Sequence, residues 1–402
     1  MGSIWKVTVV LPIPIMCSNG PLAENASIVF QFLPILLIYT GISALSLFIY
    51  RMEAVIVYRY EPSKLRRFVY QTKSFSIEVQ WLEQLFSKIG AFLNLFHLFF
   101  LTRKSMMTSS VNSIMIGIAL CDLLSMCNVI KTEYMTVNPM GTECTPPPSL
   151  IRMNIDWLLT SIQNGLRRCS SWLGVLIALV RYLVISNIMN TRVASSGFGF
   201  QLLSISFLIS SFFSALFFYQ FHFEQISVWN PDATCPGPSA PVYGQSCNKL
   251  FEMEQGLFHR IQLVVEGVLG KIMPCILLPI LTGLLLLKLS APERTAFRNS
   301  RFAHHQDRIT SLVIYIAITY LITEFPLGIV YIIDAIWHND PVIGQSTKKV
   351  EILCNTIFTL NASLHCLLCF AMSTSYRKTV GGVLSFVKLK KKTTTSIVSR
   401  IT

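Results

Sequence analysis

The chain contains eight stretches of mostly apolar residues, and this pattern constrains its fold more than any other feature. Seven of them follow one another between Trp81 and Met372, and the eighth, Ile28–Tyr50, precedes them. Each stretch is long enough to cross a bilayer, because a membrane-spanning helix needs about 20 apolar residues. Only 13% of the 402 residues are charged and 52% are hydrophobic, and an average soluble domain carries about 25% charged residues. This composition argues against both disorder and a soluble enzyme.

The seven later stretches predict an all-α membrane protein built as a seven-transmembrane helix bundle. The predicted spans are Trp81–Leu101, Ser110–Ile130, Asp156–Ser186, Gly199–Tyr219, Leu257–Leu289, Ile309–Trp337 and Val350–Met372. The fifth and sixth spans contain prolines (Pro274, Pro279 and Pro326), which predict kinks. Prolines are tolerated inside membrane helices because neighbouring helices provide partners for the backbone groups that they leave unbonded. We expect a seven-transmembrane domain at 78–375, an N-terminal region at 1–77 and a basic cytoplasmic tail at 376–402.

The basic residues indicate how the bundle is oriented. With the C-terminus inside, the inner segments hold sixteen Lys and Arg residues and the outer loops hold five, or six if Arg260 is counted. This excess predicts an N-terminal side that faces outward, in a multi-pass protein of the plasma membrane. The same orientation puts the loop cysteines Cys144, Cys235 and Cys247 on the oxidising side, where a disulfide persists.

The early stretch Ile28–Tyr50 does not fit this topology. With an eighth span, the two ends of the chain would lie on the same side of the membrane. It is too long and too far from Met1 for the core of an ordinary signal peptide. Three interpretations stay open: an extra span, a segment lying on the membrane surface, or a stretch outside the working protein. Asn25-Ala26-Ser27 is a glycosylation sequon that is useful only if this end is lumenal.

Ionisable side chains inside the spans are the first candidates for function, since burying a charge in lipid is costly. Asp122 lies in the middle of the second span, where it is either an ion- or water-linked switch or a structural carboxylate bonded to a neighbouring helix. Arg181 lies at the cytoplasmic end of the third span, where spacing alone favours an interfacial anchor.

Arg167 and Arg168 lie on the outer half of the third span. Adjacent residues point about 100° apart on a helix, so at least one of the two should face the bundle interior. They either bind a ligand carboxylate or pair with Glu266 or Glu324. Gln163 is a further ligand-binding candidate.

Two more spans carry buried charges near prolines. Glu324, two residues before Pro326, either couples binding to helix movement or forms a static salt bridge with one of the paired arginines. Glu266 and Lys271 are five residues apart and therefore point to different faces of a helix, so we expect separate partners on neighbouring helices.

Other function classes lack their motifs. The sequence has no Gly-rich phosphate loop, no HExxH and no GxSxG motif, so we expect no enzyme, no cofactor and no metal site. It has no inverted repeats and no potassium-filter motif, which weakens a transporter or channel interpretation. Its basic excess is assigned to topology, so no nucleic-acid partner is implied.

The span residues together resemble the rhodopsin-like G protein-coupled receptors. Asp122-Leu123-Leu124 looks like the second-helix motif, and Arg181-Tyr182 stands where an Asp-Arg-Tyr motif would, with Val180 in place of the acid. Pro326 matches the sixth-helix proline. His365 replaces the Asn of the usual Asn-Pro-x-x-Tyr motif in the last helix.

More specific segments resemble the nematode serpentine receptor class W, whose members resemble FMRFamide-type neuropeptide receptors. These segments are Leu101–Met106, Arg167–Val175, Lys271–Thr282 and Met372–Arg377. The likeness extends from about Glu78 to about Val383 and leaves out roughly the first 75 residues.

This resemblance implies a mechanism. Agonist binding favours a state in which the sixth helix swings outward near Pro326 and Arg181 contacts a heterotrimeric G protein. The activation residues it implies are Arg181, Tyr182, Asp122, Pro326, His365 and Tyr376. Val180 removes the resting partner of Arg181 and implies higher basal activity. Asp122 would be the sodium-site carboxylate, although His365 weakens that assignment.

The resemblance also implies a disulfide and an extracellular peptide ligand. The preferred disulfide is Cys144–Cys235, with Cys247 as the alternative partner. Acidic residues assigned to the outer loops would steer a basic peptide: Glu224, Asp232, Glu252, Glu254, Asp334, Asp340 and Glu351. The Lys388–Lys392 run would contact anionic membrane lipid.

Three functions therefore remain as hypotheses. The first is a neuropeptide receptor that signals through a heterotrimeric G protein. The second is a chemosensory receptor for a small environmental molecule. The third is a transporter or channel that uses the buried charges as a pathway.

Overall fold

A computed structural model describes residues 62–136, 146–186, 191–231, 238–290, 301–337, 341–373 and 375–383. Within them, seven helices are long and apolar enough to cross a membrane. The hydrophobic stretch Ile28–Tyr50, the sequon at Asn25 and the cysteines Cys144 and Cys235 lie outside the described residues.

The seven predicted spans are confirmed as helices. The first four are α2 (Pro62–Leu101), α3 (Ser110–Thr136), α4 (Leu150–Ser186) and α6 (Ser196–Tyr219). The fifth is continuous through α7 (Lys249–Val265), η1 (Glu266–Ile272) and α8 (Met273–Ser290). The last two are α9 (Arg301–Ile336) and α10 (Pro341–Met372), and the short α5 (Thr191–Ala194) precedes α6.

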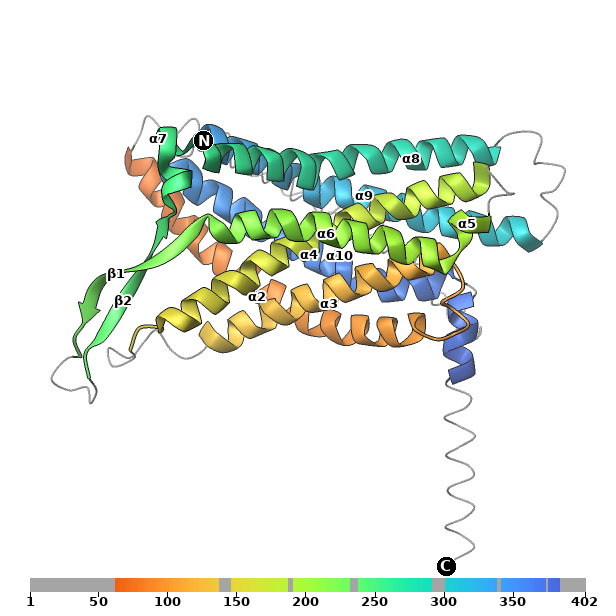
Figure 1. The fold of residues 1–402 in the computed structure, drawn as a ribbon, viewed down its shortest axis with the longest axis horizontal. Coiled ribbons are helices and arrows are strands. Elements are labelled where there is room, and N and C mark those ends of the chain that lie inside the picture. Colours follow the sequence, from red (N-terminus) through yellow and green to blue (C-terminus); the bar gives the residue numbers. More distant parts are fainter. Residues whose placement is uncertain are drawn as a thin grey trace, which may run out of the picture.

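The seven helices lie side by side (Figure 1), and their contacts close them into a ring. The first helix, α2, packs against both α3 and α10, so the two ends of the bundle meet. The third spanning helix, α4, contacts α3, α6 and α8 and is therefore central. Its fully buried residues include Cys169, Leu173 and Ala178, which belong to the main hydrophobic core.

Small side chains let α6 approach α4 closely. The buried residues of α6 are Gly199, Ser206, Ser210 and Ser214, while Phe212 is 62% exposed on the opposite side. In a membrane, helix association relies on such close packing, because lipid is as apolar as the side chains. The exposed aromatic and aliphatic side chains of α6 therefore mark its lipid-facing surface.

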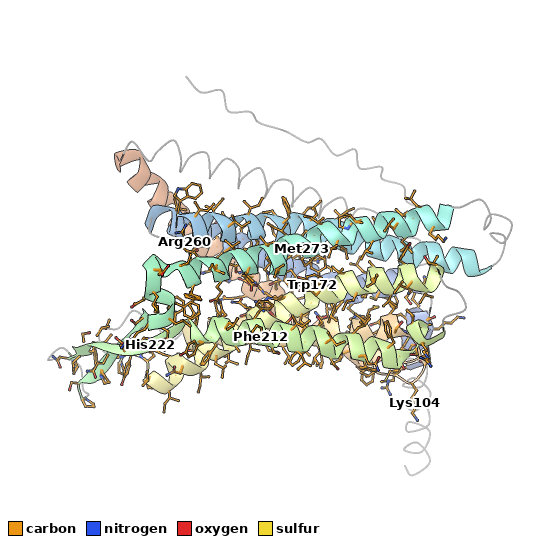
Figure 2. All side chains as sticks on the ribbon, turned by 45° about the horizontal axis from the view of Figure 1, so that its top comes forward. Lys104, Trp172, Phe212, His222, Arg260 and Met273 are labelled. Atoms are coloured by element: carbon orange, nitrogen blue, oxygen red, sulfur yellow. The ribbon has the colours of Figure 1, made fainter. Side chains whose placement is uncertain are left out.

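A β-hairpin projects from one end of the bundle and was not predicted from the sequence. β1 (Phe221–Trp229) pairs antiparallel with β2 (Ala240–Cys247), with an irregular register between Gln225 and Ser227. Figure 2 shows His222 of this hairpin and Lys104, in the connection before α3, at opposite ends of the molecule. By the orientation that the basic residues predict, the hairpin end is extracellular.

A short helix lies across the other end of the bundle (Figure 1). It comprises residues 375–383, most of which the sequence had placed in the cytoplasmic tail. Tyr376 is its buried anchor, with 1% of its surface exposed. Its hydroxyl group lies 3.0 Å from Nδ1 of His97 on α2.

The fifth spanning helix contains one wide π-helical turn, η1. Proline cannot donate a backbone hydrogen bond, and its ring displaces the carbonyl four residues earlier, so Pro274 disturbs the turn before it. The N–H of Met273 accordingly bonds to the carbonyl of Val268, five residues back. Such turns frequently mark functional sites, and this one carries both Glu266 and Lys271.

Candidate functional site

A large cavity opens at the hairpin end of the bundle, with a volume of about 740 Å³. Residues from α2, α3, α4, α7, α9 and α10 line it, and the root of the hairpin adds Phe221 and Gln245. Such a volume lies within the range of about 300–1,000 Å³ that is usual for ligand sites. The cavity therefore has the size and position of a binding site reached from outside the cell.

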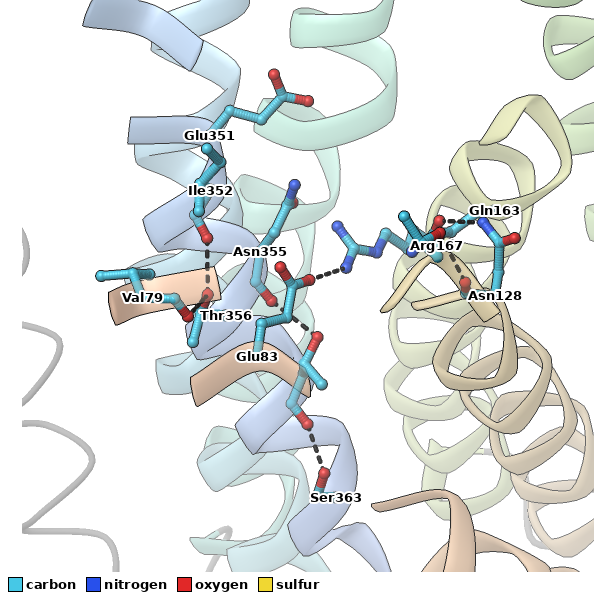
Figure 3. A network of polar contacts seen from close by, with 12 residues as sticks. Val79, Glu83, Asn128, Gln163, Arg167, Glu351, Ile352, Asn355, Thr356 and Ser363 are labelled. Atoms are coloured by element: carbon cyan, nitrogen blue, oxygen red, sulfur yellow. Dashed lines mark hydrogen bonds and ion pairs between the residues drawn. The ribbon is translucent and has the colours of Figure 1, made fainter. Parts of the chain in front are cut away.

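Arg167 and Glu83 form an ion pair across this cavity (Figure 3). Nη2 of Arg167 lies 3.4 Å from Oε1 of Glu83, and both side chains are largely buried. On the same side of α4, Gln163 accepts a hydrogen bond of 2.6 Å from the amide of Asn128. The structure thus places Arg167 and Gln163, two predicted ligand-binding candidates, on the wall of the outer cavity.

Two further carboxylates line the opposite wall of the cavity. Asp334 on α9 accepts a hydrogen bond from the hydroxyl group of Thr347 at 3.3 Å. Glu351 on α10 accepts one from the hydroxyl group of Tyr331 at 3.2 Å. Hydroxyl donors leave the negative charge in place, so this wall attracts a cationic group. The sequence had assigned both residues to outer loops, but they lie on helices.

The hairpin is held over the cavity by aromatic contacts with Trp157 on α4. The Trp157 ring stacks on Phe217 with centroids 4.9 Å apart and meets Phe221 edge-on at 5.3 Å. Its indole N–H donates to the carbonyl of Phe218 at 2.9 Å. The side chain of Gln220, where β1 begins, contacts the ring of His259 on α7. These contacts fix the hairpin root as one side of the cavity.

Arg168 points to a different face from its neighbour and does not line the outer cavity. Its guanidinium pairs with Glu266 on η1, and Nη1 donates to the carbonyl of Ser210 at 3.0 Å. Of the alternatives left open for the two arginines, the pairing with Glu266 is therefore present for Arg168. Both partners instead line a second cavity, between α4, α6 and η1.

Glu324 pairs with Lys271, so the salt bridge to Arg167 or Arg168, one of the two alternatives for Glu324, is not the pairing that the structure has. Nζ of Lys271 lies 2.7 Å from Oε2 of Glu324, with side-chain exposures of 5% and 2%. The backbones of η1 and α9 touch here, because a Cβ atom on Gly328 would lie 2.9 Å from the carbonyl oxygen of Gly267. This close approach brings Lys271 within reach, so Glu266 and Lys271 do have separate partners, as expected.

Asp122 is bonded through both carboxylate oxygens. The hydroxyl group of Ser170 donates to one oxygen at 3.0 Å, and Nδ1 of His365 lies 3.0 Å from the other. A sodium ion prefers oxygen ligands, so a nitrogen donor facing the carboxylate does not fit a sodium site. Tyr320 of α9 joins the group, since its hydroxyl donates to the carbonyl of Ser170 at 3.3 Å.

Arg181 lies near the inner end of α4, beside Tyr182 and the fully buried Val180. Its Nε atom is buried and has no hydrogen-bond partner among the described residues.

Pro326 is buried within α9. Tyr376 is bonded to His97, as described above, and burial raises the pKa of its hydroxyl group, which keeps it neutral.

Cys247 carries a free thiol at the end of β2. Partial burial, together with the charge of Glu252, raises its pKa. Cys144, the partner in the alternative pairing through Cys247, lies outside the described residues. The preferred pairing of Cys144 with Cys235 lies outside the described residues and stays a prediction.

Sequence reasoning missed the residues that complete the outer cavity. Glu83 lies in the first third of the predicted span Trp81–Leu101 and was not a site candidate, yet it proves to be the partner of Arg167. Trp157, Asn128 and Tyr331 were not singled out, since an aromatic or amide side chain in a span has no signature of its own. A charge in the first third of an apolar span was the only available signal, and it pointed to Glu83.

Seven spanning helices around an outward-facing polar cavity, with charged pairs beneath it, define a seven-transmembrane receptor. Residues 81–387 match the family model described as serpentine type 7TM GPCR chemoreceptor Srw. The match covers more than half of the chain, so the protein belongs to this family of G protein-coupled receptors, and it is a multi-pass membrane protein. Among curated proteins, none matches the chain.

Proposed function

We propose that this receptor binds an extracellular peptide with a basic group in the outer cavity and signals through a heterotrimeric G protein. The observation that carries the proposal is the acidic wall formed by Asp334 and Glu351. The charge of Arg167 is matched by Glu83, and Lys348 also lines the cavity. Two carboxylates and one lysine then remain, so this wall keeps an excess of negative charge that attracts a cation. An Arg or Lys side chain of a peptide supplies such a group.

The hairpin supports a peptide in particular. Phe221 and Gln245 lie at its root and line the cavity, and the two strands extend away from the bundle. A peptide longer than the cavity would run out along these strands. Exposed strand edges offer unpaired backbone groups to an extended segment.

A second candidate ligand is a small environmental amine, and the family description as a chemoreceptor favours it. Such a molecule would use the same acidic wall without reaching the hairpin. The two candidates differ in what the hairpin contributes. Substitutions on the hairpin strands should weaken a peptide and leave a small amine unaffected.

Ligand panels would test the proposal in cells that carry a G protein reporter. One panel holds amidated FMRFamide-type peptides and the other holds small amines. With the activating ligand, Glu351→Gln should raise the half-maximal concentration at least about tenfold, which corresponds to about 1.4 kcal/mol. Glu78→Gln is the matched control, because Glu78 is an exposed carboxylate on α2 that lines neither the cavity nor the hairpin.

The proposal fails if the activating ligand has no cationic group, or if Glu351→Gln responds as the parent protein does at equal surface expression. A response to amines alone would keep the acidic wall and replace the peptide by the second candidate. Replacement of the exposed hairpin residue Ile226 by Asp then separates the candidates, since only a peptide that runs along the strands would lose potency.

A further inference from the structure

A second cavity lies inside the membrane-crossing part of the bundle, away from the outer cavity. Its volume is about 270 Å³, and residues of α4, α6 and the π-helical turn η1 enclose it. We call it the intramembrane cavity and define it by Arg168, Trp172, Ile205, Ile209, Glu266 and Leu269. No part of the proposed signalling function uses it.

The opening of the intramembrane cavity faces lipid. Its rim residues Ile205, Ile209 and Leu269 are 54%, 55% and 42% exposed, although all three lie within spans. Apolar side chains that are exposed within a span contact acyl chains. A molecule would therefore enter from the bilayer, and it must be lipophilic.

The wide turn of η1 shapes this cavity. The indole N–H of Trp172, midway along the bundle (Figure 2), donates to the carbonyl of Leu269 at 3.2 Å. Gly270 leaves the space for the Glu266 carboxylate, because a Cβ atom there would lie 2.9 Å from Oε1 of Glu266. The cavity thus depends on a glycine and on a π-helical turn, rather than on loose packing of apolar side chains.

The lining of the intramembrane cavity is mostly apolar, and the charged pair of Arg168 and Glu266 is the polar feature that selects the ligand. The guanidinium of Arg168 is occupied by Glu266, by the carbonyl of Ser210 and by the ring of Phe213 at 5.3 Å. The Glu266 side chain is still 16% exposed, and a carboxylate accepts more than one hydrogen bond. A donor is therefore favoured beside this pair, whereas an acid would be repelled by Glu266.

We propose that the intramembrane cavity binds an uncharged lipophilic alcohol, such as a sterol, whose hydroxyl group donates to Glu266. The apolar body of the ligand would lie against Ile205, Ile209 and Leu269. A hydroxyl group matches the charged pair because it is a neutral donor, and a rigid apolar body suits an opening that faces lipid.

Photolabelling of the full-length receptor in membranes tests this proposal. The probe is a photoreactive, clickable analogue of cholesterol, and the competitors are cholesterol and cholesterol methyl ether. The ether keeps the apolar body and loses the hydroxyl donor. We expect saturable labelling that cholesterol displaces and the ether does not, with the crosslinked peptide from α6 or η1.

Two variants locate the site. Ile209→Trp fills the mouth of the cavity and should abolish the displaceable labelling. Leu208→Trp is the matched control, since Leu208 is 68% exposed on the same helix and does not line the cavity. Equal labelling of both variants would overturn the proposal. So would equal displacement of the probe from the parent protein by cholesterol and by its methyl ether, which would indicate general lipid contact.

Discussion

At the scale of single residues, the buried charges show how much a partner matters in a membrane. Lys271 and Glu324 are both nearly inaccessible and lie 2.7 Å apart. Removing one partner of a buried pair leaves an uncompensated charge, whereas replacing both with apolar groups is often tolerated. The pair therefore stabilises the contact between η1 and α9 only while it is complete.

We predict that Glu324→Gln destabilises the receptor by about 3–5 kcal/mol, because the charge of Lys271 is left unpaired. The double variant with Lys271→Met should be more stable than Glu324→Gln alone. Thermal unfolding of purified receptor in detergent measures both. Lys348→Met, an exposed lysine, is the control, and a double variant that is less stable than either single one would contradict the prediction.

His365 gives Asp122 a partner that makes a bound sodium ion unnecessary. We predict that replacing sodium with N-methylglucamine at constant ionic strength leaves ligand affinity unchanged in the parent receptor. His365→Asn replaces the ring by a carbonyl oxygen, a ligand type that hard cations prefer, so affinity should become sodium-dependent. Ligand binding at varied sodium concentration is the measurement, and sodium dependence in the parent protein would refute this role of His365.

The pair of Val180 and Arg181 belongs to the same scale. Val180 is fully buried and Nε of Arg181 is unpartnered among the described atoms, so no acid at position 180 holds the arginine at rest. We predict that Val180→Asp lowers ligand-independent signalling, since the new carboxylate would pair with Arg181. Reporter output per receptor at the surface measures this, with Val180→Asn as a neutral control of similar size. Unchanged basal output in the Asp variant would contradict it.

At the scale of elements, the helices were predictable and their contacts were not. Each apolar run lies on one of the spanning helices from α2 to α10, because a bilayer requires about 20 apolar residues in helical form. The helices extend beyond these runs, and α2 already begins at Pro62 whereas the predicted span begins at Trp81. The π-helical turn before Pro274 could not be predicted, since proline also ends or kinks helices without one. The partner of Glu324 depends on this turn, and for that reason the sequence could offer an arginine bridge as an alternative but could not indicate Lys271.

The hairpin is an element that could not be predicted from the sequence. The segment after α6 contains prolines, and its pattern did not predict two paired strands. Likewise, the adjacent arginines were correctly expected on different faces, because the helical period requires it. The period could not indicate that one arginine faces the outer cavity and the other faces the membrane interior.

We predict that Gly328→Ala separates η1 from α9. The added methyl group would lie 2.6 Å from Cγ1 of Ile272 and 2.9 Å from a backbone oxygen that cannot move freely. Overpacking of this kind costs about 1–3 kcal/mol. Gly283→Ala on α8 is the matched control, since no atom lies within 4 Å of its added methyl group. Unfolding midpoints of the two variants should differ, and equal midpoints would show that the two helices do not touch there.

At the scale of the whole molecule, the distribution of basic residues and the position of the large cavity indicate the same extracellular end. The basic residues put the hairpin end outside, and the large polar cavity opens at that end. The opposite end presents Arg181 and the short helix of residues 375–383, where a G protein would bind. A ligand shifts such a receptor only if it binds the active state more tightly than the resting state.

The central claim is that ligand binding at the outer cavity is transmitted to a G protein through Arg181. The most direct test is dose-dependent G protein activation by the parent receptor and by Arg181→Glu at equal surface expression. The account predicts a saturable response in the parent protein and none in the variant, with ligand binding retained in both. An unchanged response in Arg181→Glu, or a ligand-dependent ion current that persists when G proteins are blocked, would contradict it.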